Sequence, residues 1–246
     1  LLDHLKSTGL STQAARMMMR SGQVFYRGLP TADGSREVDP ADVDLRPTGP
    51  RIHIGRAPVL LHRDRFIMVV FKPAGLLSAT TSGRREISML ASMHRLFGTV
   101  LPIHLLPEEI AGVMVLALTR PIQEALKAQQ ASFDVRFRAI VDGVFEEARD
   151  GVAPVEAVGA RNSLVEITPG ERSLDAMRAR LAAWDHPILG DRQHAPGRLS
   201  RVHPHPTLYG STLGFDHPGS GAAMRFELPL PDDLEIFRRK VVRTGA

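Results

Sequence analysis

The most apolar stretches of this 246-residue chain are short, and their length limits what the chain can fold into. Residues 66–71 (FIMVVF) and 113–118 (VMVLAL) are far shorter than the roughly 20 apolar residues that a membrane-spanning helix needs. Residues 66–71 have the length of a β-strand buried in a protein core. With 43% apolar and 24% charged residues, the composition is that of a globular protein with a sizeable core. The sequence therefore excludes a membrane-spanning protein and predicts a buried strand at residues 66–71.

Charge gives the first indication of a partner. The formal net charge is +4, and only four of the 31 basic residues are lysines. Arginine is suited to bidentate phosphate contacts and to stacking on bases, although an arginine-rich genome produces the same bias. Because the sequence begins at Leu1 rather than at a methionine, we expect a processed or trimmed N-terminus.

The sequence offers little support for a metal or another cofactor. Cysteine is absent, which excludes disulfides, thiolate nucleophiles and cysteine-ligated metals. The histidines at 194, 203 and 205 have no ligand at helical spacing beside them, and Pro204 and Pro206 indicate a rigid polar loop. Phosphate-loop, nucleophile-elbow and dinucleotide motifs are absent as well. We therefore predict no metal and no cofactor.

Residues 1–49 have the pattern of a small helical and stranded unit. A short helix ends at Gly9, Ser11 is suited to cap a second helix that runs to Arg20, and an alternating strand follows. Arg16 and Arg20 lie four residues apart on one helical face, and Arg27 follows on the strand. A solvated surface stripe would give the same spacing.

The order of these elements resembles the S-four-like RNA-binding module. Two short helices are followed by RSGQVFYRG and by an acidic turn that ends in DVDLRP. The resemblance implies that the second helix and the following strand face RNA, through Arg16, Arg20 and Arg27. It divides the chain into an S-four-like domain (residues 1–49), a linker (50–56) and a larger domain (57–246).

The larger domain resembles the RluA-type pseudouridine synthases. Its segments match that family's strand, Lys-Pro-Ala-Gly corner, catalytic segment and closing strands in the family's order: residues 60–77, 104–119, 135–143, 186–191, 213–218 and 226–231. The resemblance implies an α+β fold in which a mixed, mostly antiparallel sheet carries flanking helices.

The same resemblance implies that the catalytic residues are not intact. In the family, an Asp in the segment H-R-L-D acts as nucleophile or base on a flipped uridine, an Arg holds that Asp, and a Tyr stacks on the base. Here Pro107 stands at the Asp position, Leu105 at the Arg of this segment, and Phe137 at the Tyr. Proline has no ionisable group, and phenylalanine cannot exchange a proton.

Two substitutes for the missing carboxylate stay open. Glu108 and Glu109 are neighbours of Pro107, but a shift of one residue moves a side chain by about 3.3–3.6 Å, and solvated surface glutamates are the simpler interpretation. Asp175 could act beside Arg172 and Arg178, but an acid in a helix's first turn is stabilised by the helix dipole alone.

Basic residues around the former catalytic site are retained better than the catalytic residues themselves. The resemblance places Lys72, Arg172, Arg178 and Arg180 along or around a cleft for RNA. Neutralising the phosphates of RNA requires positive charge but no nucleophile, so RNA binding can persist without catalysis.

The sequence therefore predicts a catalytically inactive synthase homologue that binds ribosomal RNA as a structural or ribosome-assembly factor. We expect ribosomal or assembly proteins as further partners, no membrane association, and a mitochondrial or other organellar matrix rather than the cytoplasm. The alternatives are an active RNA pseudouridine synthase with a rebuilt site, and a protein-interaction module that no longer binds RNA.

Overall fold

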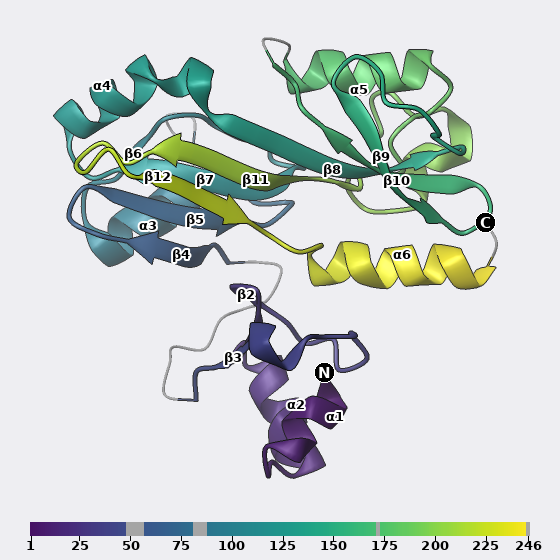
Figure 1. Cartoon of the computed structure of the whole chain (residues 1–246), viewed down its shortest axis with the longest axis horizontal. Helices are drawn as coiled ribbons and strands as arrows, with labels where there is room; N and C mark the ends of the chain where they lie inside the picture. Colours follow the sequence, from purple (N-terminus) through teal and green to yellow (C-terminus); the bar gives the residue numbers. More distant parts are fainter. Residues whose placement is uncertain (48–56, 81–87, 171–172, 245–246) are drawn as a thin grey trace.

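A small N-terminal module and a larger body make up the chain (Figure 1). The computed structural model describes residues 1–47, 57–80, 88–170 and 173–244. The predicted linker, residues 50–56, lies outside these described residues. No helix in the described ranges is both long enough and apolar enough to cross a membrane.

The N-terminal module contains the two predicted helices. Its elements are α1 (Leu2–Ser7), α2 (Thr12–Arg20), β1 (Val24–Tyr26), β2 (Leu29–Pro30) and β3 (Val43–Leu45). Ser11 caps α2, since its Oγ accepts a hydrogen bond from the Ala14 N–H at 3.1 Å. The strands form an antiparallel sheet in the order β2-β1-β3. The sequence pattern did not predict β2, because a strand of two residues carries no periodicity.

The body is built on one wide sheet, to which the described residues contribute nine strands. The strands are β4 (Val59–Arg63), β5 (Ile67–Lys72), β6 (Leu101–Pro102), β7 (Ala111–Ala117), β8 (Asp134–Asp142), β9 (Val152–Val158), β10 (Asn162–Ile167), β11 (Leu208–Asp216) and β12 (Ala223–Glu227). Their order is β4-β5-β7-β11-β8-β10-β9, with β12 paired to β11 and β6 to β7. Only the β7–β11 pair among them is parallel, which confirms the mixed, mostly antiparallel sheet expected for an α+β fold.

The two apolar stretches of the sequence form neighbouring strands of this sheet. Every residue of β5 and of β7 is buried, and the two strands pair antiparallel. Strands that are covered on both faces are continuously apolar rather than alternating. The prediction of a buried strand at residues 66–71 is therefore confirmed.

Helices cover both faces of the sheet. The helices of the body are α3 (Met89–Phe97), α4 (Arg120–Ala128), α5 (Leu174–Ala183) and α6 (Asp232–Thr244). Met93 of α3 and Met177 of α5 pack with Phe137 and Val141 of β8 on one face. On the other face, Phe237 of α6 packs against the intervening residue of β8, Ile140. Neighbouring residues of one strand point to opposite faces, so the sheet separates α5 from α6.

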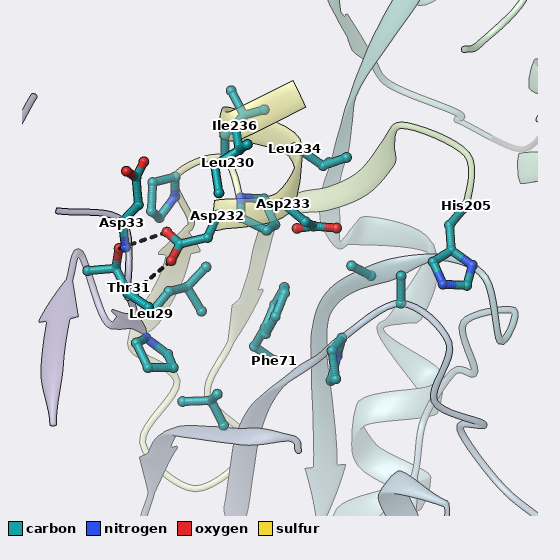
Figure 2. A pocket seen from close by; sticks show the side chains of 18 of the residues that line it. Leu29, Thr31, Asp33, Phe71, His205, Leu230, Asp232, Asp233, Leu234 and Ile236 are labelled. Carbon is teal, nitrogen blue, oxygen red and sulfur yellow. Dashed lines mark hydrogen bonds between the residues drawn. The ribbon is translucent and has the colours of Figure 1, made fainter. Parts of the chain in front are cut away.

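The N-terminal module contacts the first turn of α6 (Figure 2). The Asp232 carboxylate accepts hydrogen bonds from the Thr31 hydroxyl at 2.7 Å and from the Ala32 N–H at 2.8 Å. It also pairs with the buried Arg36 at 2.9 Å, and Arg239, about two helical turns further along α6, pairs with Asp33. A cavity of about 570 Å³ lies beside this contact, between Leu29, Phe71, His205 and Leu230 among other residues.

Candidate functional site

The segment that aligns with the family's catalytic motif is a loop before β7. Just after this loop, Gly112, the second residue of β7, lies directly against Gly210 of β11, and a Cβ added to Gly112 would come within 2.9 Å of the Gly210 nitrogen. The two strands therefore approach closely at this point. The Gly75 N–H donates to the Glu108 carbonyl at 2.8 Å, which ties the loop to the Lys-Pro-Ala-Gly corner.

Lys72 forms the centre of that corner. Its side chain is fully buried, and its Nζ donates to the carbonyl oxygens of Pro73 at 3.1 Å, Leu76 at 2.7 Å and Glu108 at 3.1 Å. Burial lowers the pKa of Lys72 to about 8, although the charges of Glu109 and Glu108 act in the opposite direction. Lys72 therefore joins two loops of the site from inside the protein and has no exposed surface.

The lowered pKa of Lys72 predicts that stability rises with pH above about pH 8. Between about pH 8 and pH 10 the folded protein has lost a proton that the unfolded chain keeps, so the free energy of unfolding increases by up to about 1.4 kcal/mol per pH unit. Burial raises the pKa of Tyr209 to about 12. The folded protein therefore keeps a proton that the unfolded chain loses, which lowers the free energy of unfolding as pH rises, but only above about pH 10. Urea unfolding between about pH 8 and pH 10 should show this increase in the free energy of unfolding for the wild type. The Lys72→Met variant should not show it. An equal rise in the variant would contradict the assignment.

Arg178 on α5 is the second buried cation of the region. Its side chain is 5% exposed, and it forms a two-point pair with Asp191, from Nε at 2.9 Å and from a terminal nitrogen at 2.8 Å. Burial alone would raise the pKa of the Asp191 carboxyl. The hydrogen bonds and the charge of Arg178 outweigh burial and hold this pKa below its ordinary value. Asp191 is the last residue of HPILGD, a segment that matches the family, but the sequence did not predict it as a site residue.

Two more carboxylates face the same arginine. Glu109 lies 3.2 Å from a terminal nitrogen of Arg178, and Asp175 lies 3.8 Å from the same nitrogen. Asp175 is in the first turn of α5, where its carboxylate also lies 3.0 Å from Nε2 of His194. The side chain of Glu108, in contrast, is exposed. Of the substitutes considered from the sequence, Glu109 and Asp175 therefore lie beside Arg178.

The structure places the three residues that the resemblance aligns with catalytic positions of the family in different surroundings. Pro107 is exposed on the loop, and Leu105 is 55% exposed. The Phe137 ring is only 6% exposed and packs into the core on the α5 face. In this structure the ring of Phe137 is therefore covered by protein side chains.

The predicted RNA-binding cations fall into two groups. Lys72 and Arg178 are buried, and Arg180 pairs with Asp150. Arg172 lies outside the described residues. The structure therefore brings Lys72 and Arg178 to the site but engages both in internal contacts.

The cations of the N-terminal module are more accessible. Arg27 pairs with Asp42 at 2.7 Å while its side chain stays 55% exposed. Arg16 and Arg20 are exposed on α2 and form no ion pair with any residue of the described chain. Within the same ranges, no group of three histidine or acidic residues is arranged to hold a metal ion.

Comparison with known proteins identifies related sequences and a related fold. No protein-family model matches the chain. The dual-specificity RNA pseudouridine synthase RluA of Salmonella typhimurium is 26% identical over 204 residues, which cover 70% of this chain and 92% of the relative. The ribosomal large subunit pseudouridine synthase D of Neisseria meningitidis is 24% identical over 267 residues, covering 89% and 71%.

Solved structures show the same fold. Human RNA pseudouridylate synthase domain containing 4 superposes with a TM-score of 0.60 at 18% identity, covering 75% of this chain and 92% of that one. Human RNA pseudouridylate synthase domain containing 1 gives a TM-score of 0.57 at 15% identity, covering 71% and 84%.

Proposed function

The homologues of this chain are RluA and RluD pseudouridine synthases, and from this premise we propose that it is a catalytically inactive member of that group that binds ribosomal RNA. Its role is structural, as a ribosome-assembly factor. Its partners are ribosomal RNA and ribosomal or assembly proteins, and its location is a mitochondrial or other organellar matrix. The names of the relatives support RNA as the partner. One is an RNA pseudouridine synthase, and the other is a pseudouridine synthase of the ribosomal large subunit.

The exposed Pro107 carries this proposal. Isomerisation of uridine requires a carboxylate at hydrogen-bond distance from the flipped nucleotide, and a displacement of about 1 Å can cost a hundredfold in rate. At the aligned position the loop presents a pyrrolidine ring. The neighbouring Leu105 presents an apolar side chain where the family segment has its arginine.

Binding through the N-terminal module is consistent with the loss of catalysis. The exposed Arg16 and Arg20 extend from one face of α2 at a spacing of one helical turn. Free guanidinium groups at this spacing can contact phosphates of an RNA backbone. This surface needs no residue of the former catalytic site.

Arg16→Glu combined with Arg20→Glu is therefore expected to weaken binding to a ribosomal RNA transcript by about tenfold or more and to reduce the salt dependence of binding. The melting temperature should change little, because both side chains are exposed. Filter binding at several salt concentrations measures both effects. The matched control is Arg120→Glu with Lys127→Glu on α4, which makes the same change in charge on another exposed surface. Equal affinities of the two double variants would remove α2 from the RNA interface.

The alternative is an active synthase with a rebuilt site, and one observation favours it. Glu109 is a carboxylate two residues after the aligned nucleophile position, and it lies 3.2 Å from Arg178. In the family an arginine holds the catalytic Asp, so this pair has the required chemistry. If the alternative is correct, the protein converts uridine in a ribosomal RNA transcript, Glu109→Gln abolishes the conversion, and Glu108→Gln does not.

A further inference from the structure

A pocket with a basic lining lies on the sheet face opposite the aligned catalytic site. The pocket has a volume of about 680 Å³. Its walls come from the end of β8, the turn between β9 and β10, residues 197–202 and the last turns of α6. Its lining includes the buried Leu189 and Phe237, which pack with Ile140 of β8. Because Phe137 and Ile140 point to opposite faces of the sheet, this pocket is separate from the Pro107 loop.

Positive charge is concentrated around this pocket. Its ionisable lining consists of three cationic side chains, Arg161, Arg198 and Lys240, and one carboxylate, Asp142. Arg161 and Arg198 are exposed, as is Arg201, which lines a hollow that also includes Arg198. None of these three arginines forms an ion pair within the part of the chain that the structure describes. They differ in this from Arg178 and Arg180, whose charges are already paired.

Exposed apolar side chains line the same pocket. Val144 is 52% exposed and Val202 is 41% exposed, and both line the pocket. A surface that combines exposed apolar groups with unpaired arginines matches the two parts of a nucleotide, a base with an apolar face and a charged phosphate. The volume is in the range of about 300–1,000 Å³ that is typical of small-ligand sites.

We propose that this pocket receives a nucleotide of single-stranded RNA, with the base against Val144 and Val202 and the adjacent phosphates on Arg161 and Arg198. The inference rests on the proposed RNA-binding function and extends it, because it assigns a second RNA contact that is independent of the former catalytic site. The positive charge of the rim selects RNA over a neutral or basic peptide, since every nucleotide brings one phosphate.

The test uses the full chain and a fluorescently labelled single-stranded RNA of ribosomal sequence. Arg161→Glu with Arg198→Glu is expected to weaken binding at least tenfold and to lower the slope of log affinity against log salt by about 1–2. Arg161→Lys with Arg198→Lys keeps the charge and should stay within about threefold of the wild type. Arg120→Glu with Lys127→Glu on α4 is the matched control, at the other end of the sheet from the last turns of α6 (Figure 1). Circular dichroism melts confirm that each variant is folded.

Ultraviolet crosslinking followed by peptide mapping supplies a measurement that does not depend on charge. A crosslinked nucleotide on residues 197–202 or on Phe237 is the expected result. If the wild type binds RNA but the Arg161/Arg198 variant matches the control and no crosslink maps to this pocket, the inference is wrong and the proposed function stands. If the wild type shows no salt-dependent RNA binding, both are wrong.

Discussion

Asp191→Ala is expected to lower the free energy of unfolding by about 3–5 kcal/mol, because it leaves the buried charge of Arg178 without its two-point partner. The Asp191 carboxylate has no exposed surface, and it also accepts hydrogen bonds from the backbone N–H groups of Gln193 and His194. Glu109 and Asp175 remain beside Arg178 in the variant, but both are substantially exposed and cannot replace the lost contacts.

Urea unfolding of two variants measures this effect. Asp175→Ala removes a carboxylate from the same arginine at an exposed position, so it should cost less than about 1 kcal/mol. Asp191→Ala combined with Arg178→Met should recover part of the loss, since it removes the unpaired charge. Equal stabilities of Asp191→Ala and Asp175→Ala would show that the buried pair does not hold the site together.

Gly190→Ala should be the second strongly destabilising change, at about 2–5 kcal/mol. Gly190 has a φ of +76°, a conformation that side-chain-bearing residues avoid. A Cβ at this position would also lie 2.4 Å from the His205 carbonyl oxygen. Because that atom belongs to the backbone, it cannot move away without displacing the segment that precedes β11.

Gly221→Ala separates the two contributions. Gly221 has a similar φ of +70°, but nothing lies within 4 Å of its Cβ position. It should therefore show the conformational cost alone, about 1–2 kcal/mol. If both variants melt at the same temperature, the close approach of Gly190 to His205 does not contribute to stability.

The fold of the body was predictable because several segments match one family in one order. The buried strand β5, the Lys-Pro-Ala-Gly corner and the cap at Ser11 all follow from local sequence. The contact of Asp232 with Thr31 and Arg36 was not predictable, since it joins residues about 200 positions apart. Sequence spacing carries no information on such a pair.

The sequence predicted which residues belong to the candidate site better than it predicted the contacts that they make. Pro107 and Leu105, which the resemblance aligns with catalytic positions, lie on an exposed loop. The burial of Lys72 and the pairing of Arg178 with Asp191 were not foreseen, because a basic residue in a sequence has the same appearance whether it faces solvent or a buried carboxylate. The position of Glu109 beside Arg178 depends on where two loops meet, which a single sequence does not specify.

The pseudouridine content of ribosomal RNA transcripts after incubation with the purified protein tests the central proposal most directly. The Salmonella RluA enzyme serves as the positive control on a transcript that it modifies. We predict no pseudouridine above the protein-free level, at protein concentrations where salt-dependent RNA binding is saturated. Conversion at a defined uridine that Glu109→Gln abolishes would contradict the proposal and identify Glu109 as the replacement carboxylate.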